Sequence, residues 1–371
     1  MKKAIKIFLK GLLYTMAIIV GVYYGLAFIG ALMSGTDGVT YFLDLILAIF
    51  LAYNINVVVH EGGHLVFGLL CGYRFCSFRV WSFMLVRQNG RFRLCRHKLM
   101  GTGGQCLMIP PEHEQTKASV ILYNLGGVIF NLIFAILCFV LNAILPEIYI
   151  LSTFLWMSAV LSIITLITNG IPLNLGGIAN DGMNALHLSK NPDAAEAFRK
   201  TLIINAAQTE GMRISEMPDE WFTLPEGADM QNVHCASLKV FAASRPLDIG
   251  DTVTAEQQII QILDSKDNII GLHRNLLTCD LICCKWLNGS PVELKHYMTP
   301  ELAKTIKAMR DYPQIIRTEY FTALFDLKDE KAAEILRKNF EKITRNFPYK
   351  QELDSERTLM DKALEKYKSQ T

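Results

Sequence analysis

The chain has 371 residues, of which 51% are hydrophobic and only 19% are charged, and its formal net charge is +2. This composition is unusual for a soluble protein of such length. The balanced charge and the lack of any nucleic-acid-binding motif argue against a nucleic-acid partner. Apolar residues are concentrated before about residue 175, so we divide the chain into a transmembrane part, 1–187, and a cytosolic helical part, 188–371.

The first apolar run covers residues 11–33 and follows the basic residues Lys2, Lys3, Lys6 and Lys10. A signal peptide would also begin with basic residues before an apolar stretch. This run is longer than a typical signal-peptide core, however, and no clear small-residue cleavage site ends it. We therefore expect a retained transmembrane helix.

The second apolar run, Tyr41–Leu70, contains the pattern HExxH in its later half, as His60, Glu61 and His64. On a helix the two histidines lie one turn apart on the same face, where two imidazoles can bind one zinc ion. Glu61 would lie beside the metal, where a carboxylate can take a proton from water. Ionisable residues inside a membrane-length segment are costly and usually functional, so we interpret the motif as a catalytic zinc site rather than a chance match.

The loop that follows, residues 72–117, is strongly basic. Its eight cationic residues outnumber Glu112 and Glu114, and under the positive-inside rule they place this loop, like the N-terminus, in the cytoplasm. The cationic residues are Arg74, Arg79, Arg87, Arg91, Arg93, Arg96, Lys98 and Lys117.

Within this loop, Asn89-Gly90 lies between Phe75–Val86 and Arg91–Leu94, which predicts a β-hairpin. Because its strands mix aromatic residues with arginine, the hairpin could lie against the membrane interface. The alternative is a basic loop that only sets the topology, and the sequence does not separate the two. The glycines of 101–104 and the prolines at 110 and 111 interrupt the chain before the next helix.

Two further apolar runs, Ala118–Leu145 and Ile148–Ile171, predict two more membrane spans. With about four spans in total, the segment after residue 172 returns to the cytoplasm, so both termini are expected there. Asp181 is then the first carboxylate after the motif helix that can lie near membrane depth on the cytoplasmic side. The topology brings it to the same side as His60 and His64.

Taken together, these features resemble the site-2 protease family of intramembrane zinc metalloproteases over roughly the first half of the chain. The resemblance rests on three segments that occur in the family's order, namely the HExxH motif, the helix with Gly126-Gly127 and Asn131, and the segment from Asn169 through Pro172 to Asp181-Gly182.

The resemblance implies a role for each matching residue. His60, His64 and Asp181 would bind Zn²⁺, with His187 as an alternative third ligand. Glu61 would be the general base, and Asn131 and Asn169 would help to hold the substrate backbone or an oxyanion.

The implied function is hydrolysis of peptide bonds in or near transmembrane segments of membrane-bound proteins or peptides. Regulators, signal-peptide remnants and peptide precursors are candidate substrates, and a bacterial plasma membrane is the expected location. A substrate helix hides its carbonyl groups and must unwind, and we hypothesise that it pairs with the edge of the 75–94 hairpin. The alternatives are a catalytically silent chaperone or immunity-type relative, against which the intact Glu61 argues, and a transporter, against which the lack of an inverted repeat argues.

Nine cysteines without a CxxC pair predict reduced thiols rather than a disulfide framework, and none is expected to bind zinc. In the second half, Met217–Gly250 is expected to be irregular because of its prolines. The other helices resemble a tetratricopeptide-like solenoid, either a docking surface for a substrate or regulator or a packed domain that stabilises the membrane part. The predicted helices are Pro192–Gln208, Ala255–Ser265, Ile269–Leu287, Pro300–Arg310, Pro313–Leu327, Asp329–Asn346 and Leu353–Lys368.

Overall fold

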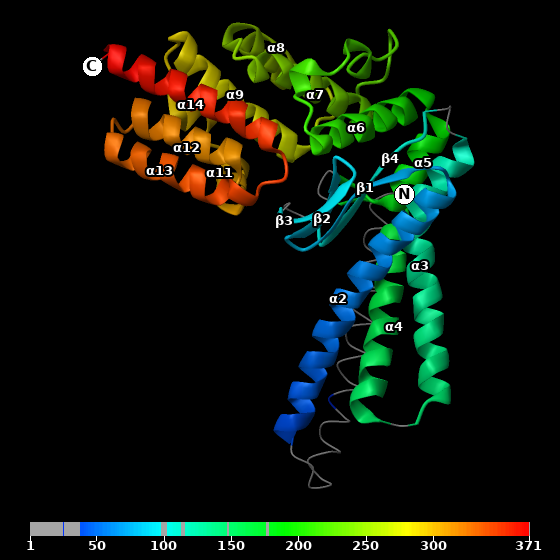
Figure 1. The fold of residues 1–371 in the computed structure, drawn as a ribbon. Coiled ribbons are helices and arrows are strands. Elements are labelled where there is room, and N and C mark those ends of the chain that lie inside the picture. The colour runs from blue at the N-terminus through cyan, green and yellow to red at the C-terminus, as the bar shows by residue number, and fades with distance from the viewer. Residues whose placement is uncertain are drawn as a thin grey trace.

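The computed structural model describes Gly25 and residues 38–97, 102–112, 116–146, 148–175 and 178–370. This part of the chain is mainly helical and contains three helices that are long and apolar enough to cross a membrane (Figure 1). They are α2 (Gly38–Leu70), α3 (Lys117–Ile144) and α4 (Tyr149–Gly170). Three of the four predicted spans thus correspond to helices that could cross a membrane, whereas the first, residues 11–33, lies outside the described residues.

Between α2 and α3 the basic loop folds into an antiparallel sheet in the order β3-β2-β1-β4. The predicted hairpin is confirmed, because Asn89 and Gly90 join β2 to β3 with φ angles of 49° and 74°. Two residues with positive φ are the usual connection of a tight hairpin. The strands are β1 (Arg74–Val80), β2 (Phe83–Gln88), β3 (Arg91–Arg96) and β4 (Gly104–Ile109).

The sheet differs from the prediction in two ways. The single strand expected over Phe75–Val86 is wrong, because a tight turn at Trp81, with a φ of 56°, divides it into β1 and β2. No glycine or asparagine marks this turn, which is held instead by the Arg79 side chain donating to the Trp81 carbonyl at 2.6 Å. Strand β4 was not predicted at all, since its glycine and proline neighbours indicated only a break in the chain.

The Trp81 turn fixes the sheet against the side of α2. Trp81 Nε1 donates to Asn54 Oδ1 at 2.8 Å, and its ring packs against Tyr53. Asn54 precedes His60 by six residues, which corresponds to about 9 Å along a helix. The turn therefore lies beside a part of α2 that is farther from the C-terminal end of this helix than the HExxH motif is.

After α4 the chain forms a short hairpin and then the helix that carries Asp181. The hairpin consists of β5 (Asn174–Leu175) and β6 (Ile178–Ala179), and it leads into α5 (Asp181–Lys190) and α6 (Pro192–Glu210). The division of the chain at residue 187 stays a prediction, and it falls within α5.

The remaining helices agree with the sequence at most positions. The short helix α10 was not predicted, and neither was α7, which occupies the second half of the segment 217–250 that was expected to be irregular. Pro246 indicated a break in the chain, but it lies near the C-terminal end of this helix. The helices are α7 (Val233–Asp248), α8 (Thr252–Asp264), α9 (Gly271–Asn288), α10 (Leu294–Tyr297), α11 (Pro300–Ala308), α12 (Pro313–Phe325), α13 (Glu330–Ile343) and α14 (Lys350–Gln370).

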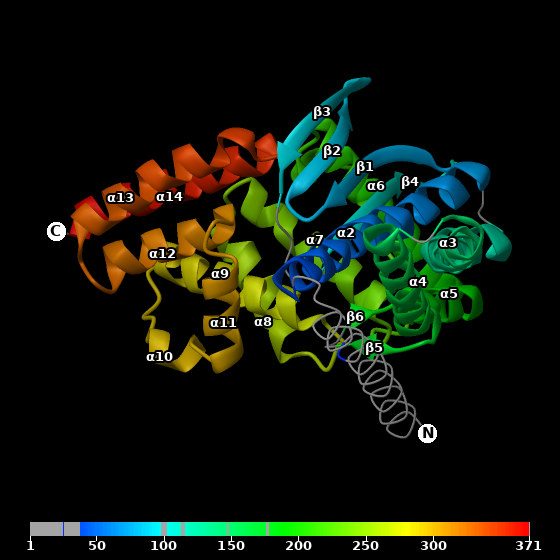
Figure 2. The same cartoon turned by 90° about the horizontal axis from the view of Figure 1, so that it is seen from below.

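The C-terminal helices have their own core and also contact the sheet (Figure 2). Neighbours in sequence pack together, as α8 does with α9 and α12 with α13, but the tetratricopeptide-like arrangement stays a prediction. Gln88 of β2 donates to the carbonyls of Thr209 and Pro348. His97 packs against Phe347 and Tyr349, and burial lowers its pKa to about 4, so the ring is neutral. All nine cysteines are free thiols, as predicted.

Candidate metal centre

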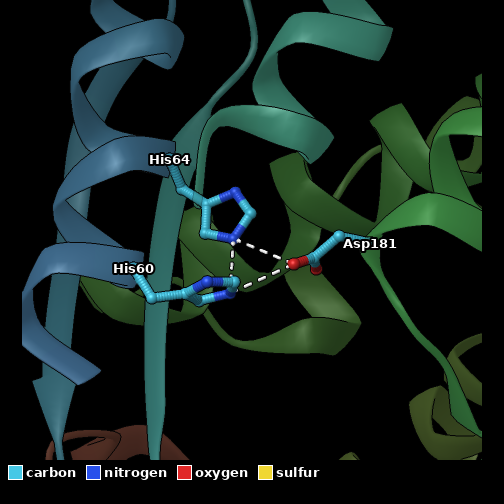
Figure 3. Close-up of side chains that lie close together, drawn as sticks. All are labelled: His60, His64 and Asp181. Atoms are coloured by element: carbon cyan, nitrogen blue, oxygen red, sulfur yellow. Dashed lines mark hydrogen bonds and ion pairs between the residues drawn. The ribbon is translucent and has the colours of Figure 1, made fainter. Parts of the chain in front are cut away.

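Three side chains from two distant segments meet near the cytoplasmic end expected for α2 (Figure 3). His60 and His64 lie one turn apart on α2, and Asp181 is the first residue of α5. Asp181 Oδ2 lies 3.1 Å from His60 Nε2 and 3.6 Å from His64 Nε2, and the two Nε2 atoms are 3.3 Å apart. Within the part of the chain that the structure describes, this is the one group of three donors that could hold a metal ion.

The spacing of these atoms fits a zinc ion. Ligand atoms about 2.0–2.2 Å from a tetrahedral centre lie about 3.3–3.6 Å from one another, and the three observed separations are close to this range. Asp181 Oδ2 is buried and has no hydrogen-bond partner of good geometry, even though both imidazoles point toward it. A cation between the three atoms would satisfy that oxygen, because buried polar atoms without partners are costly. Two imidazoles and a carboxylate are also a donor set typical of catalytic zinc.

Both histidines are oriented by acceptors behind them. His60 Nδ1 lies 2.7 Å from Asn131 Oδ1 on α3, and His64 Nδ1 lies 2.8 Å from the Tyr123 carbonyl oxygen. If each Nδ1 carries the proton and donates it to that oxygen, each Nε2 keeps its lone pair for a metal. Such contacts fix the tautomer and the ring direction of metal-binding histidines.

Asn131 is itself held in a buried polar network between the three spans. Its amide nitrogen lies 3.4 Å from Asn56 Oδ1, which also accepts a hydrogen bond from Ser162 of α4. Asn56 in turn donates to the carbonyl of Ser158 at 3.2 Å. The link from Asn56 through Asn131 to His60 depends on how the helices cross.

We expect Asn131→Ala to lower the affinity for zinc about 10–100-fold, since the loss of a hydrogen-bonded partner of a metal-binding histidine has effects of this size. Zinc retained by the purified protein during titration with a chelator measures the effect. Asn54→Ala is the control, because Asn54 contacts Trp81 rather than a histidine. An unchanged affinity in Asn131→Ala would contradict this role.

Asp181 is placed by the residue before it. Asn180 caps α5 by accepting from Met183 N and also accepts from Leu173 N, while its amide group donates to the carbonyls of Thr168 and Ile171. Burial would raise the pKa of Asp181, but His60 and His64, when protonated, face the carboxylate and hold its pKa well below the usual value. The carboxylate is therefore ionised and available as a ligand.

Close helix packing also shapes the site. A Cβ added to Gly63 would overlap the Gly126 carbonyl oxygen, so α2 and α3 cross backbone to backbone. A Cβ on Gly127 would lie 2.7 Å from His64 Nε2 and from His60 Cε1. The absence of a side chain at Gly127 therefore leaves room for the two rings.

A cavity of about 630 Å³ opens onto the three donors. Glu61 lines it, with a side chain that is only 8% exposed, and a Cβ on Gly104 would contact the Glu61 side chain. Residues 102–106 line the cavity as well, so the β4 edge of the sheet borders the site. Tyr123 belongs to the same wall and donates its hydroxyl proton to the Cys106 carbonyl at 3.0 Å.

The other predicted site residues lie in different places. Asn169 lines the cavity at the end of α4, whereas Asn131 is fully buried behind His60. Their contacts with substrate stay predictions. His187 lies six residues further along α5 than Asp181, and the structure does not bring it into the donor group.

The site combines an HExxH motif on an apolar helix, a carboxylate from a distant segment and a polar cavity. This combination is typical of a membrane metallopeptidase. Residues 48–152 match the model of peptidase family M50, which is the site-2 protease family of membrane zinc metalloproteases. This match confirms the resemblance; it includes His60, Glu61 and His64 and ends before Asp181. No curated protein and no solved structure gave a significant match to the chain.

Proposed function

We propose that the protein is an intramembrane zinc endopeptidase that hydrolyses peptide bonds in or near transmembrane segments of membrane-bound substrates. The observation that carries this proposal is the convergence of His60, His64 and Asp181 in one cavity with Glu61. Asp181 is separated from the motif by more than a hundred residues. The short distances between its oxygen and both imidazoles support binding of one metal ion by all three residues rather than a chance HExxH sequence.

In this site zinc would polarise the scissile carbonyl and make water a better nucleophile. Glu61 would accept the proton of the attacking water and then donate it to the leaving amine, as a general base and acid. Asn131 and the Tyr123 carbonyl keep both imidazoles turned toward the cavity.

An unwound substrate would lie beside β4, on whose outer edge the Cys106 carbonyl already accepts a hydrogen bond from Tyr123. Both β3 and β4 are edge strands of the sheet, but β4 is the one that borders the catalytic cavity. A substrate strand that paired with β4 would pass beside Glu61, and backbone pairing would suit many sequences. We therefore propose β4 as the docking edge in place of the edge of the 75–94 hairpin, which is β3.

The expected cellular setting follows from the sequence. The basic loop and the basic N-terminus favour a cytoplasmic location for the sheet, the site mouth and both termini. Cleavage would then occur near the cytoplasmic ends of substrate segments in what we take to be a bacterial plasma membrane. Regulators, signal-peptide remnants and peptide precursors remain the candidate substrates, and the C-terminal helices remain a candidate docking surface for a regulator.

We expect Glu61→Gln to retain zinc and to lose cleavage by about 10²–10⁴-fold, the usual contribution of a general base. The test uses full-length protein in lipid nanodiscs, a panel of labelled single-span peptides and zinc per chain measured by mass spectrometry. Zinc with no cleavage of any peptide in the wild type would favour a chaperone or immunity-type role. If the wild-type protein binds no zinc, the peptidase hypothesis is contradicted and the transporter hypothesis remains.

A further inference from the structure

The outward face of the β2–β3 hairpin is both apolar and basic. Residues directly opposite on paired strands share a face, and in this register each outward pair combines two apolar residues or one apolar residue with arginine. All six side chains are exposed, with Phe92 at 66% and Leu94 at 68%. We call this surface the hairpin face, and it consists of Phe83, Leu85, Arg87, Phe92, Leu94 and Arg96.

The opposite side of the same two strands is already covered. Met84, Val86 and Cys95 are buried there and pack against Tyr349. The hairpin therefore has one face that completes a core with the C-terminal helices and one face with no such cover among the described residues. A contiguous exposed apolar surface of this kind marks an interaction site in most proteins.

The hairpin face also lacks opposing charge. No aspartate or glutamate occurs between residues 62 and 111, and neither Arg87 nor Arg96 forms an ion pair with any residue that the structure describes. The Arg96 guanidinium lies 5.4 Å above the Phe83 ring. An anionic partner would be complementary to both arginines.

The position of the hairpin indicates which partner this is. Trp81, just before β2, is anchored to Asn54 at a deeper level of α2 than the metal-binding histidines. Neighbouring α2 side chains such as Val58 and Leu51 are exposed and apolar, as expected of a surface in contact with lipid. The hairpin face thus adjoins the lipid-facing surface of a membrane span.

We propose that the hairpin face binds the headgroup layer of an anionic phospholipid bilayer. Its aromatic and leucine side chains enter the boundary between headgroups and acyl chains, where aromatic residues are favoured. The apolar stems of Arg87 and Arg96 lie along this boundary while their guanidinium groups bind anionic headgroups. This surface is separate from the catalytic cavity, and its lipid binding does not depend on peptidase activity.

The test places a photoreactive benzophenone side chain at Leu94 of the full chain, in nanodiscs of equal parts phosphatidylcholine and phosphatidylglycerol. The same group at Leu327, an exposed residue between α12 and α13, is the control position. We expect phospholipid adducts at position 94 only, with phosphatidylglycerol enriched over phosphatidylcholine. Each arginine should contribute up to about fivefold to this enrichment.

The arginines are tested as Arg87→Gln and Arg96→Gln, singly and together, in the Leu94-labelled protein. The preference for phosphatidylglycerol should fall toward the bilayer composition, whereas Lys307→Gln with Arg310→Gln, two exposed cations on or next to α11, should leave it unchanged. Thermal unfolding confirms that each variant is folded. Protein adducts in place of lipid adducts, no adduct at 94, or a lipid preference that ignores both arginines would overturn the proposal.

Discussion

Replacement of Asp181 by asparagine is expected to remove most of the bound zinc and to reduce cleavage on the order of 10³-fold or more. The variant keeps the shape of the side chain but loses the negative charge that faces His60 and His64 at 3.1 and 3.6 Å. Loss of a metal ion that supplies several kcal/mol of transition-state stabilisation gives a rate effect of this size. Zinc per chain and cleavage of the same labelled peptide measure the two effects.

His187→Ala is the matched control, because His187 lies on the same helix as Asp181 but outside the donor group. It should keep a full complement of zinc and near-normal cleavage. If Asp181→Asn instead retained both properties and His187→Ala lost them, the third ligand would be His187, and the donor geometry described above would not be that of the metal-loaded protein.

The second large effect is expected from Gly63→Ala, within the HExxH motif itself. Its new Cβ would overlap the Gly126 carbonyl oxygen and would lie 2.8 Å from Gly127 Cα. Both neighbours are backbone atoms, so the clash is relieved only if α2 and α3 separate. Overpacking of this kind costs about 1–3 kcal/mol or more, and separation of the helices also pulls His64 away from the Tyr123 carbonyl.

Gly62→Ala provides a control one residue away. No atom lies within 4 Å of a Cβ built on Gly62, so the same chemical change there removes only the flexibility of glycine. Replacing glycine by alanine in a helix is favourable by about 1 kcal/mol. Thermal unfolding in detergent should therefore show a lower midpoint for Gly63→Ala and an equal or higher one for Gly62→Ala, with zinc lost only in the former. Equal midpoints would contradict the close crossing.

The parts of the site that the sequence predicted are those that depend on local geometry. His60 and His64 share a face because any helix places residues four apart on one side. Asp181 was predicted from the topology, because two further membrane crossings after α2 return the chain to the same side of the membrane. The supporting contacts could not be found in this way, because the Tyr123 carbonyl and the Asn56 side chain reach the site only through the particular crossing of three helices.

The elements of the fold were likewise predicted where they depend on local sequence and missed where they depend on distant contacts. Apolar length alone predicted α2, α3 and α4, and Asn89-Gly90 predicted the hairpin turn. The Trp81 turn has no residue that favours positive φ, and it is held by a local hydrogen bond from Arg79 and a long-range one to Asn54. Helix α7 was missed because Pro246 indicated a break, although a proline this close to the end of a helix is tolerated when the packing around it is sufficient.

Tyr123 links the candidate metal site to the sheet. Its backbone carbonyl fixes His64, its hydroxyl group holds Cys106 of β4, and its ring stacks on Tyr73. Tyr123 thus joins α2, which carries His60 and His64, to β4 beside the cavity. If a substrate binds beside β4 as proposed, a shift of that strand would act on His64 through Tyr123, and substrate binding should then alter the affinity for zinc.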